Sequence, residues 1–145
     1  MDILTGMRVS SSGMAAQRMR MNTISSNIAN INTTRSPEGG PYRRKDVVLE
    51  SMPEARSFGE ILTSAPQKDV QRVQVTDVLV DRRAPLMKYE PDHVDADEKG
   101  YVAYPNINLM EEMAKMIQAT RSYEANVAAM NATKDMAMTS LEIGR

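Results

Sequence analysis

The sequence predicts an α+β fold in which two long terminal helices form a coiled-coil-like pair beside a small β-rich middle module. All seven prolines of the 145-residue chain lie between residues 37 and 105, and a proline inside a helix costs about 3 kcal/mol. On both sides of this stretch, apolar residues recur every seven positions, which is typical of helices that pack along a seam. The chain therefore divides into residues 1–36, 37–105 and 106–145.

The N-terminal segment carries two rows of mainly apolar residues with heptad spacing. Ser10 and Gln17 interrupt one row, and such polar positions specify register at some cost in stability. The run Ser10–Gly13 weakens the helix, because glycine costs about 1 kcal/mol relative to alanine. Residues 1–13 are therefore expected to become ordered when a partner holds them. The proposed N-terminal assembly seam consists of Ile3, Met7, Met14, Met21, Ile24, Ile28 and Ile31.

The C-terminal helix is expected from about residue 109 to residue 142. Asn108 has the position of an N-cap, and Glu111 follows as in a capping box. Gly144 is placed to end the helix, which would be roughly 50 Å long. Thr120 and Lys134 are polar positions in its rows. The proposed C-terminal assembly seam consists of Leu109, Met113, Met116, Tyr123, Val127, Met130 and Leu141.

The middle segment reads as short strands joined by turns. Four stretches are rich in β-branched or aromatic residues and partly alternate between apolar and polar side chains. The stretch 52–68 lacks a consistent period and is expected to be a loop. The expected strands lie at residues 42–50, 70–81, 86–90 and 100–104.

Two ways of packing the helices remain open. The chain has no Trp, one Phe and five Tyr, and its thirteen Met supply much of the large apolar volume. Methionine packs adaptably at helix interfaces, and a core this small stabilises a fold weakly. The simple interpretation is an antiparallel pair of helices packed on each other. The composition favours the other, a coiled coil that needs neighbours in an assembly.

Composition also argues against several classes of partner. A net charge of −1 gives no electrostatic field for collecting nucleic acid. No apolar run approaches the roughly 20 residues of a membrane span, and the N-terminus lacks the pattern of a cleaved secretory signal. The absence of cysteine excludes disulfides and thiolate chemistry. We expect no nucleic acid partner and no direct membrane insertion.

One acidic segment has to be considered as a metal site. Asp95, Asp97 and Gly100 match the first, third and sixth positions of a calcium loop, but Lys99 and Asn106 stand where further ligands belong. The segment therefore reads as a solvated acidic turn. Nothing marks a partner for nucleophilic or acid-base catalysis. We expect no enzyme activity, no metal, no cofactor and no small-molecule substrate.

The stretch SNIANINTT, residues 26–34, is the most specific motif. It resembles the Asn-rich motif that closes the N-terminal helix in the axial proteins of the bacterial flagellum, the rod and hook family. The inserted RSPEGGP, residues 35–41, departs from the usual pattern. The amides of Asn27, Asn30 and Asn32 lie off the apolar stripe, where they can bond to a neighbouring backbone or end the helix, and we interpret them as a joint to the β module. The matching residues are Asn27, Ile28, Ala29, Asn30 and Thr33.

Two further motifs, DHVDADEKGYVAYPNIN and RSYEANVAAMNATKDM, are similar to the proximal rod members of this family. The resemblance implies a structural subunit that assembles with itself and other rod subunits into the hollow rod of the flagellar basal body. It also implies passage through the type III export apparatus into the periplasm without a cleaved signal peptide. The helices would form an inner tube and the β module would lie outside.

An alternative function fits the same heptads and the same proline distribution. The chain would then be a cytoplasmic coiled-coil adaptor or chaperone-like binding module, with the β-rich middle as its recognition surface. Cell fractionation separates the two, because an adaptor stays soluble while a rod subunit purifies with basal bodies.

Overall fold

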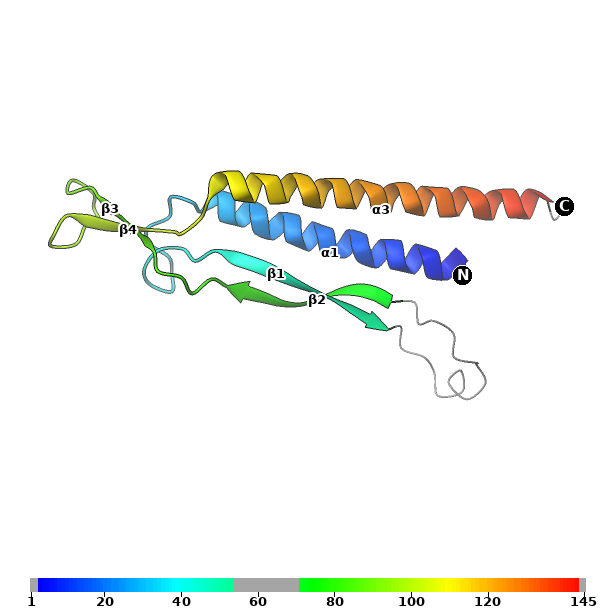
Figure 1. The fold of residues 1–145 in the computed structure, drawn as a ribbon, viewed down its shortest axis with the longest axis horizontal. Coiled ribbons are helices and arrows are strands. Elements are labelled where there is room, and N and C mark those ends of the chain that lie inside the picture. Colours follow the sequence, from blue (N-terminus) through cyan, green and yellow to red (C-terminus); the bar gives the residue numbers. More distant parts are fainter. Residues whose placement is uncertain (1–2, 54–70, 144–145) are drawn as a thin grey trace.

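The computed structural model describes residues 3–53 and 71–143. Two long helices and two β hairpins make up these residues (Figure 1), which confirms the predicted α+β class. The helix expected at residues 109–142 is confirmed to within one residue. The elements are α1 (Ile3–Ala29), β1 (Lys45–Pro53), β2 (Gln71–Val80), β3 (Leu86–Tyr89), β4 (Tyr101–Tyr104) and α3 (Leu109–Ile143).

Helix α1 is the middle layer of the molecule. It lies antiparallel to α3 on one side and packs against the β1–β2 hairpin on the other (Figure 1). Within the described residues, no Cα atom of the β1–β2 hairpin lies within 8 Å of a Cα atom of α3. The position of the hairpin relative to α3 is therefore set by α1 and by the loops at its C-terminal end.

Helix α3 begins where its N-cap predicts. The Asn108 side-chain oxygen accepts hydrogen bonds from the backbone N–H groups of Met110 and Glu111 at 3.0 and 3.4 Å. These bonds satisfy donors that have no partner inside the helix. Glu111 forms an ion pair with Lys115 at 2.6 Å instead of reaching back to the cap, so the second half of the expected capping box is absent.

The two helices meet along a row of small and polar residues. A Cβ at Gly6 would lie 3.7 Å from Thr133, and one at Gly13 would lie 2.9 Å from the Asn126 side chain. Ala16 and Ala119 are almost completely buried. The facing positions are seven or fourteen residues apart on both helices, in the pairs Gly6–Thr133, Gly13–Asn126 and Asn27–Glu112.

Strands β1 and β2 form an antiparallel hairpin that extends from Lys45↔Val80 to Pro53↔Gln71. The register shifts between Val48 and Leu49, which marks a β-bulge that bends and twists the ribbon. The expected strand at 42–50 is confirmed, but it begins at residue 45 and continues to Pro53, beyond the start of the expected loop. The rest of that loop, from residue 54, lies outside the described residues.

The β3–β4 hairpin projects beyond the ends of the helices (Figure 1). It pairs Leu86 with Tyr104 and Tyr89 with Tyr101, and the acidic turn joins its strands. Both strands lie where the sequence predicts them. In the part of the chain that the structure describes, no helix is long and apolar enough to cross a membrane.

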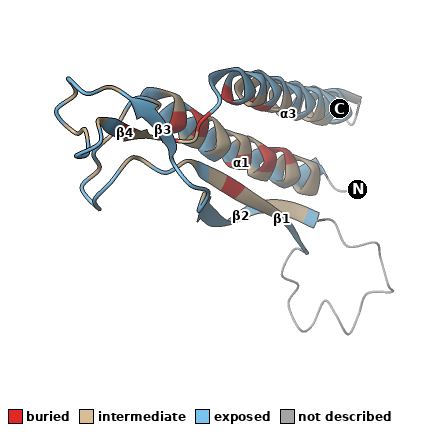
Figure 2. Cartoon of the chain, turned by 60° about the vertical axis from the view of Figure 1, so that its left-hand side comes forward, coloured by how far each residue is buried: buried red, intermediate tan, exposed pale blue. Residues whose placement is uncertain are grey.

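The interior is thin for a chain of this length. Buried positions lie mainly along α1 and in the N-terminal part of α3, with single buried residues on β1 and β4 (Figure 2). Most of α3 is exposed or half-buried, although it carries many large apolar side chains. The buried apolar residues are Ala16, Ile24, Val47, Val102, Ile107 and Ala119.

The glycines at the helix interface make a matched pair of tests. Alanine at Gly6 should raise helix stability by about 1 kcal/mol through its propensity, because its Cβ makes an ordinary contact with Thr133. Alanine at Gly13 should gain less or lose stability, because Asn126 must move while it is held by a 2.8 Å bond to the Ser122 carbonyl. Helical content and the thermal midpoint, measured by circular dichroism, would show the difference.

The control is Asn126→Ala in the Gly13→Ala background, which should recover the propensity gain. Equal stabilisation by the two single glycine variants would contradict the close packing at Gly13.

Candidate functional site: a polar junction and an exposed helix face

Asn27 connects the end of α1 to the start of β1. Its side chain is 0% exposed. The amide nitrogen donates to the Lys45 carbonyl at 2.7 Å, and the Lys45 N–H donates to the amide oxygen at 2.9 Å. The amide thus pairs with both main-chain groups of one strand residue, as a neighbouring peptide would.

The carboxylate of Glu112, in the first turn of α3, completes this arrangement. The residue is 1% exposed, and its oxygens accept from Asn27 Nδ2 at 2.9 Å and from Arg44 Nε at 2.8 Å. A carboxylate at this end of a helix is also favoured by the helix dipole. We call Asn27, Tyr42, Arg44, Lys45 and Glu112 the polar junction.

Every hydrogen-bonding position of the Asn27 amide is used. The Tyr42 hydroxyl donates to its oxygen at 3.2 Å, so the oxygen accepts two bonds and the nitrogen donates two, the full capacity of an amide. Burial opposes the charge on Arg44, but its hydrogen bonds to Glu112 and Asp46 outweigh this and raise the pKa of the guanidinium. The junction therefore buries an ion pair whose charged groups are compensated.

The other motif residues shape the chain after α1. Asn30 donates from its side chain to the Ser26 carbonyl at 2.8 Å, and the Thr33 hydroxyl donates to the Asn30 side-chain oxygen at 3.2 Å. The Tyr42 N–H then donates to the Thr33 carbonyl at 3.0 Å, which returns the chain towards β1. Ala29 is exposed.

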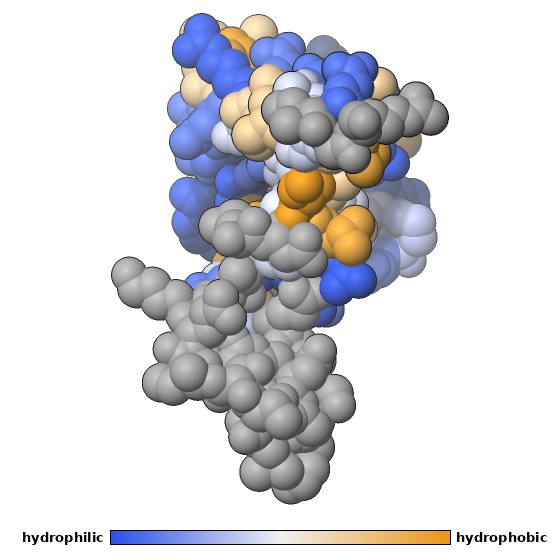
Figure 3. Space-filling model, turned by 90° about the vertical axis from the view of Figure 1, so that its right-hand side faces the viewer, coloured by the Kyte–Doolittle hydropathy of each residue, from blue (hydrophilic) through white to orange (hydrophobic). Residues whose placement is uncertain are grey.

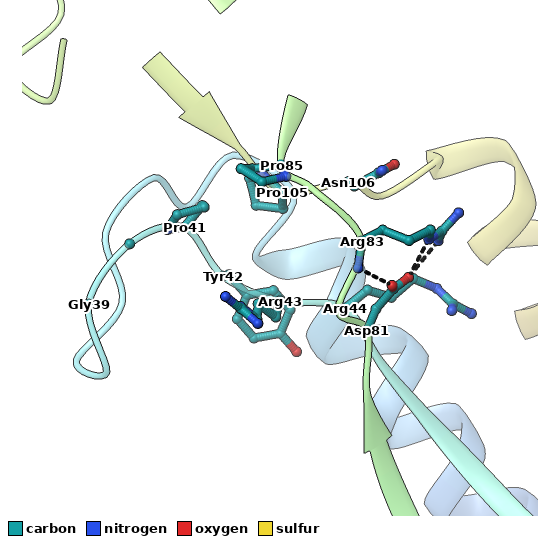
Figure 4. A pocket seen from close by; sticks show the side chains of 11 residues that line it. Gly39, Pro41, Tyr42, Arg43, Arg44, Asp81, Arg83, Pro85, Pro105 and Asn106 are labelled. Carbon is teal, nitrogen blue, oxygen red and sulfur yellow. Dashed lines mark hydrogen bonds and ion pairs between the residues drawn. The ribbon is translucent and has the colours of Figure 1, made fainter. Parts of the chain in front are cut away.

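The inserted residues 35–41 form a closed turn beside a small pocket (Figure 4). The Ser36 N–H donates to the Gly40 carbonyl at 2.8 Å, and Gly39 and Gly40 have φ values of 87° and 75°, which favour glycine. The pocket has a volume of about 100 Å³. It lies between this turn and the segments 81–85 and 105–106.

Arg83 and Asp81 form an ion pair in the pocket wall (Figure 4), with Nη2 and Oδ2 2.5 Å apart. The Asp81 carboxylate also accepts from the Arg83 backbone N–H at 2.9 Å. These bonds to Arg83 lower the pKa of Asp81 to about 2.

The outer side of α3 carries an unpartnered apolar face near its N-terminal end. Met110, Met113 and Ile117 share this face at helical spacing and are 73, 47 and 54% exposed. At the opposite end, α3 extends beyond α1 (Figure 1) and exposes Met138 and Leu141. Figure 3, which views the end where the two termini lie, shows apolar surface between hydrophilic areas.

The predicted seam residues differ in how far they are buried inside one chain. The two helices meet along the row of small and polar residues described above, so most of the large seam side chains flank it. Ile24 is buried; Met7, Met14, Met21, Ile28, Ile31, Met116, Tyr123, Val127 and Met130 are half-buried; Ile3, Leu109, Met113 and Leu141 are exposed.

The acidic turn uses two of its carboxylates internally. Asp97 Oδ1 accepts from the N–H groups of Lys99 and Tyr101 at 2.8 Å each, and Asp95 accepts from the Thr34 hydroxyl at 2.8 Å. Over residues 3–53 and 71–143, no group of three or more His, Cys, Asp and Glu side chains is arranged to hold a metal ion.

Sequence reasoning missed Arg44 and Glu112 as members of the junction. The sequence analysis assigns no role to either residue. A signal was present, since Glu112 lies seven residues before Ala119 and fourteen before Asn126, in the heptad row that faces α1.

Two family models match the segments that build this site. The model described as "Flagella basal body rod protein" matches residues 7–35, which cover most of α1 and the Asn-rich motif. The model described as "Flagellar basal body rod FlgEFG protein C-terminal" matches residues 98–143, which cover β4 and α3. Fold and motifs thus define the class as flagellar basal-body rod proteins.

Curated relatives resemble the whole chain. The flagellar basal-body rod protein FlgC of Bacillus subtilis (strain 168) is 44% identical, over 96% of each chain. That of Borreliella burgdorferi is 39% identical, over 99% of this chain and 98% of the relative. That of Escherichia coli O6:H1 is 34% identical over 100% of both. The chain belongs to the FlgC family, which confirms the resemblance seen in the sequence.

Asn27→Ala should destabilise the junction strongly. It leaves both main-chain groups of Lys45, which are partly buried, and one oxygen of the buried Glu112 without their partner. An unsatisfied group costs about 1–3 kcal/mol when it is fully buried. We expect a loss of about 2–5 kcal/mol, measured by urea denaturation. Tyrosine fluorescence can report it, because the chain has no Trp and Tyr42 lies in the junction.

Asn30→Ala is the matched control, because it removes an amide from the same motif whose bonds are local and exposed or half-buried. Its cost should stay below about 1 kcal/mol. Equal losses in the two variants would show that Asn27 has no special role.

Asp81 should titrate near pH 2 in the folded protein. Because its folded pKa lies below the ordinary aspartate pKa of 3.8, its ion pair stabilises the fold above that value, and this contribution is lost as pH falls towards about 2. NMR titration of the carboxyl carbon measures this, and Arg83→Ala should return the midpoint towards the ordinary value. An unchanged midpoint in that variant would exclude Arg83 as the cause.

Proposed function

We propose that this chain is a non-catalytic structural subunit of the flagellar basal-body rod, which assembles with itself and other rod subunits through its terminal helices. Its membership of the FlgC family over the full length of the chain carries this proposal. The exposed apolar face of α3 supports the proposed mode of assembly. The relatives do not favour the alternative of a cytoplasmic coiled-coil adaptor.

The energetic argument rests on where the apolar surface lies. Small and polar residues join α1 to α3, whereas Met110, Met113 and Ile117 face outward. Burying apolar surface contributes about 25 cal/mol per Å², so these side chains are stabilised when a neighbouring helix covers them. Different patches at the two ends of a helix favour head-to-tail contacts, which do not close and therefore extend as a helical assembly.

The predicted seams are assigned accordingly. The exposed and half-buried seam residues of both helices supply the contacts between subunits, and their polar positions set the register. Residues 1–36 and 106–145 form the inner tube of the proximal rod, and residues 37–105 lie outside it. The subunit passes through the type III export apparatus, without a cleaved signal peptide, and assembles in the periplasm.

A charge placed on the exposed face of α3 tests this proposal. A tagged Ile117→Glu variant replaces the wild-type gene. It should abolish swimming, and the subunit should be missing from purified basal bodies. A neighbouring helix would bury the new carboxylate without a partner, which is costly. Gln118→Glu places the same charge on the next exposed residue of the helix and should preserve both.

Circular dichroism of the purified variants checks that α3 still folds. Normal swimming with Ile117→Glu would contradict assembly through this face. A tagged wild-type subunit that remains in the soluble fraction of motile cells would contradict the rod function itself.

A further inference from the structure

The small pocket beside the inserted turn contains one uncompensated cation. Three arginines line it (Figure 4). Arg83 pairs with Asp81, and Arg44 pairs with Glu112 and Asp46. Arg43 is exposed and forms no hydrogen bond or ion pair with any other residue that the structure describes. The pocket therefore has a free guanidinium at its edge.

The size and walls of the pocket restrict what it can hold. Small-molecule sites are typically about 300–1,000 Å³, whereas this pocket is about 100 Å³, or roughly three water volumes. Pro41, Pro85 and Pro105 form part of its wall, and their rings restrict the backbone. The space suits the carboxylate end of one side chain, a group that arginine binds with two parallel hydrogen bonds.

The same chain presents free carboxylates elsewhere. Asp92 and Glu98 lie on the acidic turn of the projecting β3–β4 hairpin and are exposed. Neither forms a hydrogen bond or ion pair within the described residues, unlike Asp95 and Asp97. The Asp95–Thr34 bond holds the acidic turn beside the loop that follows α1 in the same chain. Neither Asp92 nor Glu98 lines the small pocket beside Arg43, which we call the Arg43 pocket. Asp81, the carboxylate that lines the pocket, is paired with Arg83, so a carboxylate of the acidic turn that reaches Arg43 comes from another copy of the chain.

We propose that the Arg43 pocket binds a carboxylate of the acidic turn, Asp92 or Glu98, from a second copy of the chain. The charges are complementary, and the two surfaces are different, so the contact is heterologous and can repeat along an assembly. It links the outer β modules of adjacent subunits, in addition to the helix contacts. The inference rests on the proposed function, because copies must lie side by side.

Crosslinking tests this contact cleanly because the chain has no cysteine. Arg43→Cys and Glu98→Cys are introduced into separate, differently tagged copies that are expressed together. A short bismaleimide is used, since the Cα atoms of an arginine–glutamate pair lie farther apart than the 4.4–6.8 Å of a typical disulfide. Purified basal bodies should yield a dimer that carries both tags. Asp77→Cys, an exposed acidic residue on β2, replaces Glu98→Cys as the matched control and should give none.

Charge reversal gives a second, independent measurement. Arg43→Glu should reduce swimming several-fold, and adding Asp92→Lys and Glu98→Lys to the same chain should restore it. Assembled rods without the two-tag dimer, or with Arg43→Cys linked to another protein, would overturn the inference and leave the proposed function standing. Failure of the wild-type tagged copies to enter basal bodies would instead remove the proposed function.

Discussion

The arrangement of the whole chain depends on the side-chain amide of Asn27. Its four hydrogen bonds join the last turn of α1 to the first residue of β1, to the loop at Tyr42 and to the first turn of α3. An amide of this kind has no spare donor or acceptor, so its partners can occupy only one arrangement. Because the backbone of the hairpin packs on α1 and not on α3, this junction aligns the outer module with the helices.

This constraint explains the distribution of apolar residues. With the ends of the helices aligned at Glu112, the heptad spacing brings Gly13 to Asn126 and Gly6 to Thr133. Small side chains let the backbones approach, and little apolar surface is consumed between them. The methionines and isoleucines beside this row therefore remain partly or fully exposed, which suits a subunit whose helices are completed by neighbours.

The sequence was sufficient for the local features of the fold. Proline distribution, heptad spacing and the Asn108 cap located α3 to within one residue, because each acts over a few positions. It was insufficient for the junction. Asn27 and Glu112 are separated by 85 residues, and Arg44 and Glu112 by 68. Amphipathic patterning marks large apolar side chains, whereas the row that joins α1 to α3 consists of small and polar residues.

The junction contributes specificity to assembly, whereas the exposed helix faces contribute binding strength. Replacing a buried ion pair by apolar side chains is often neutral or stabilising, so such a pair is weak evidence for stability. Its contribution is specificity, since it fixes one register and one orientation of the hairpin. The exposed faces of α3 have the opposite character, because apolar contact is strong but not directional. The junction fixes how the helices and the hairpin are placed within the subunit. The exposed apolar faces of α3 are therefore presented to every neighbouring subunit in the same geometry.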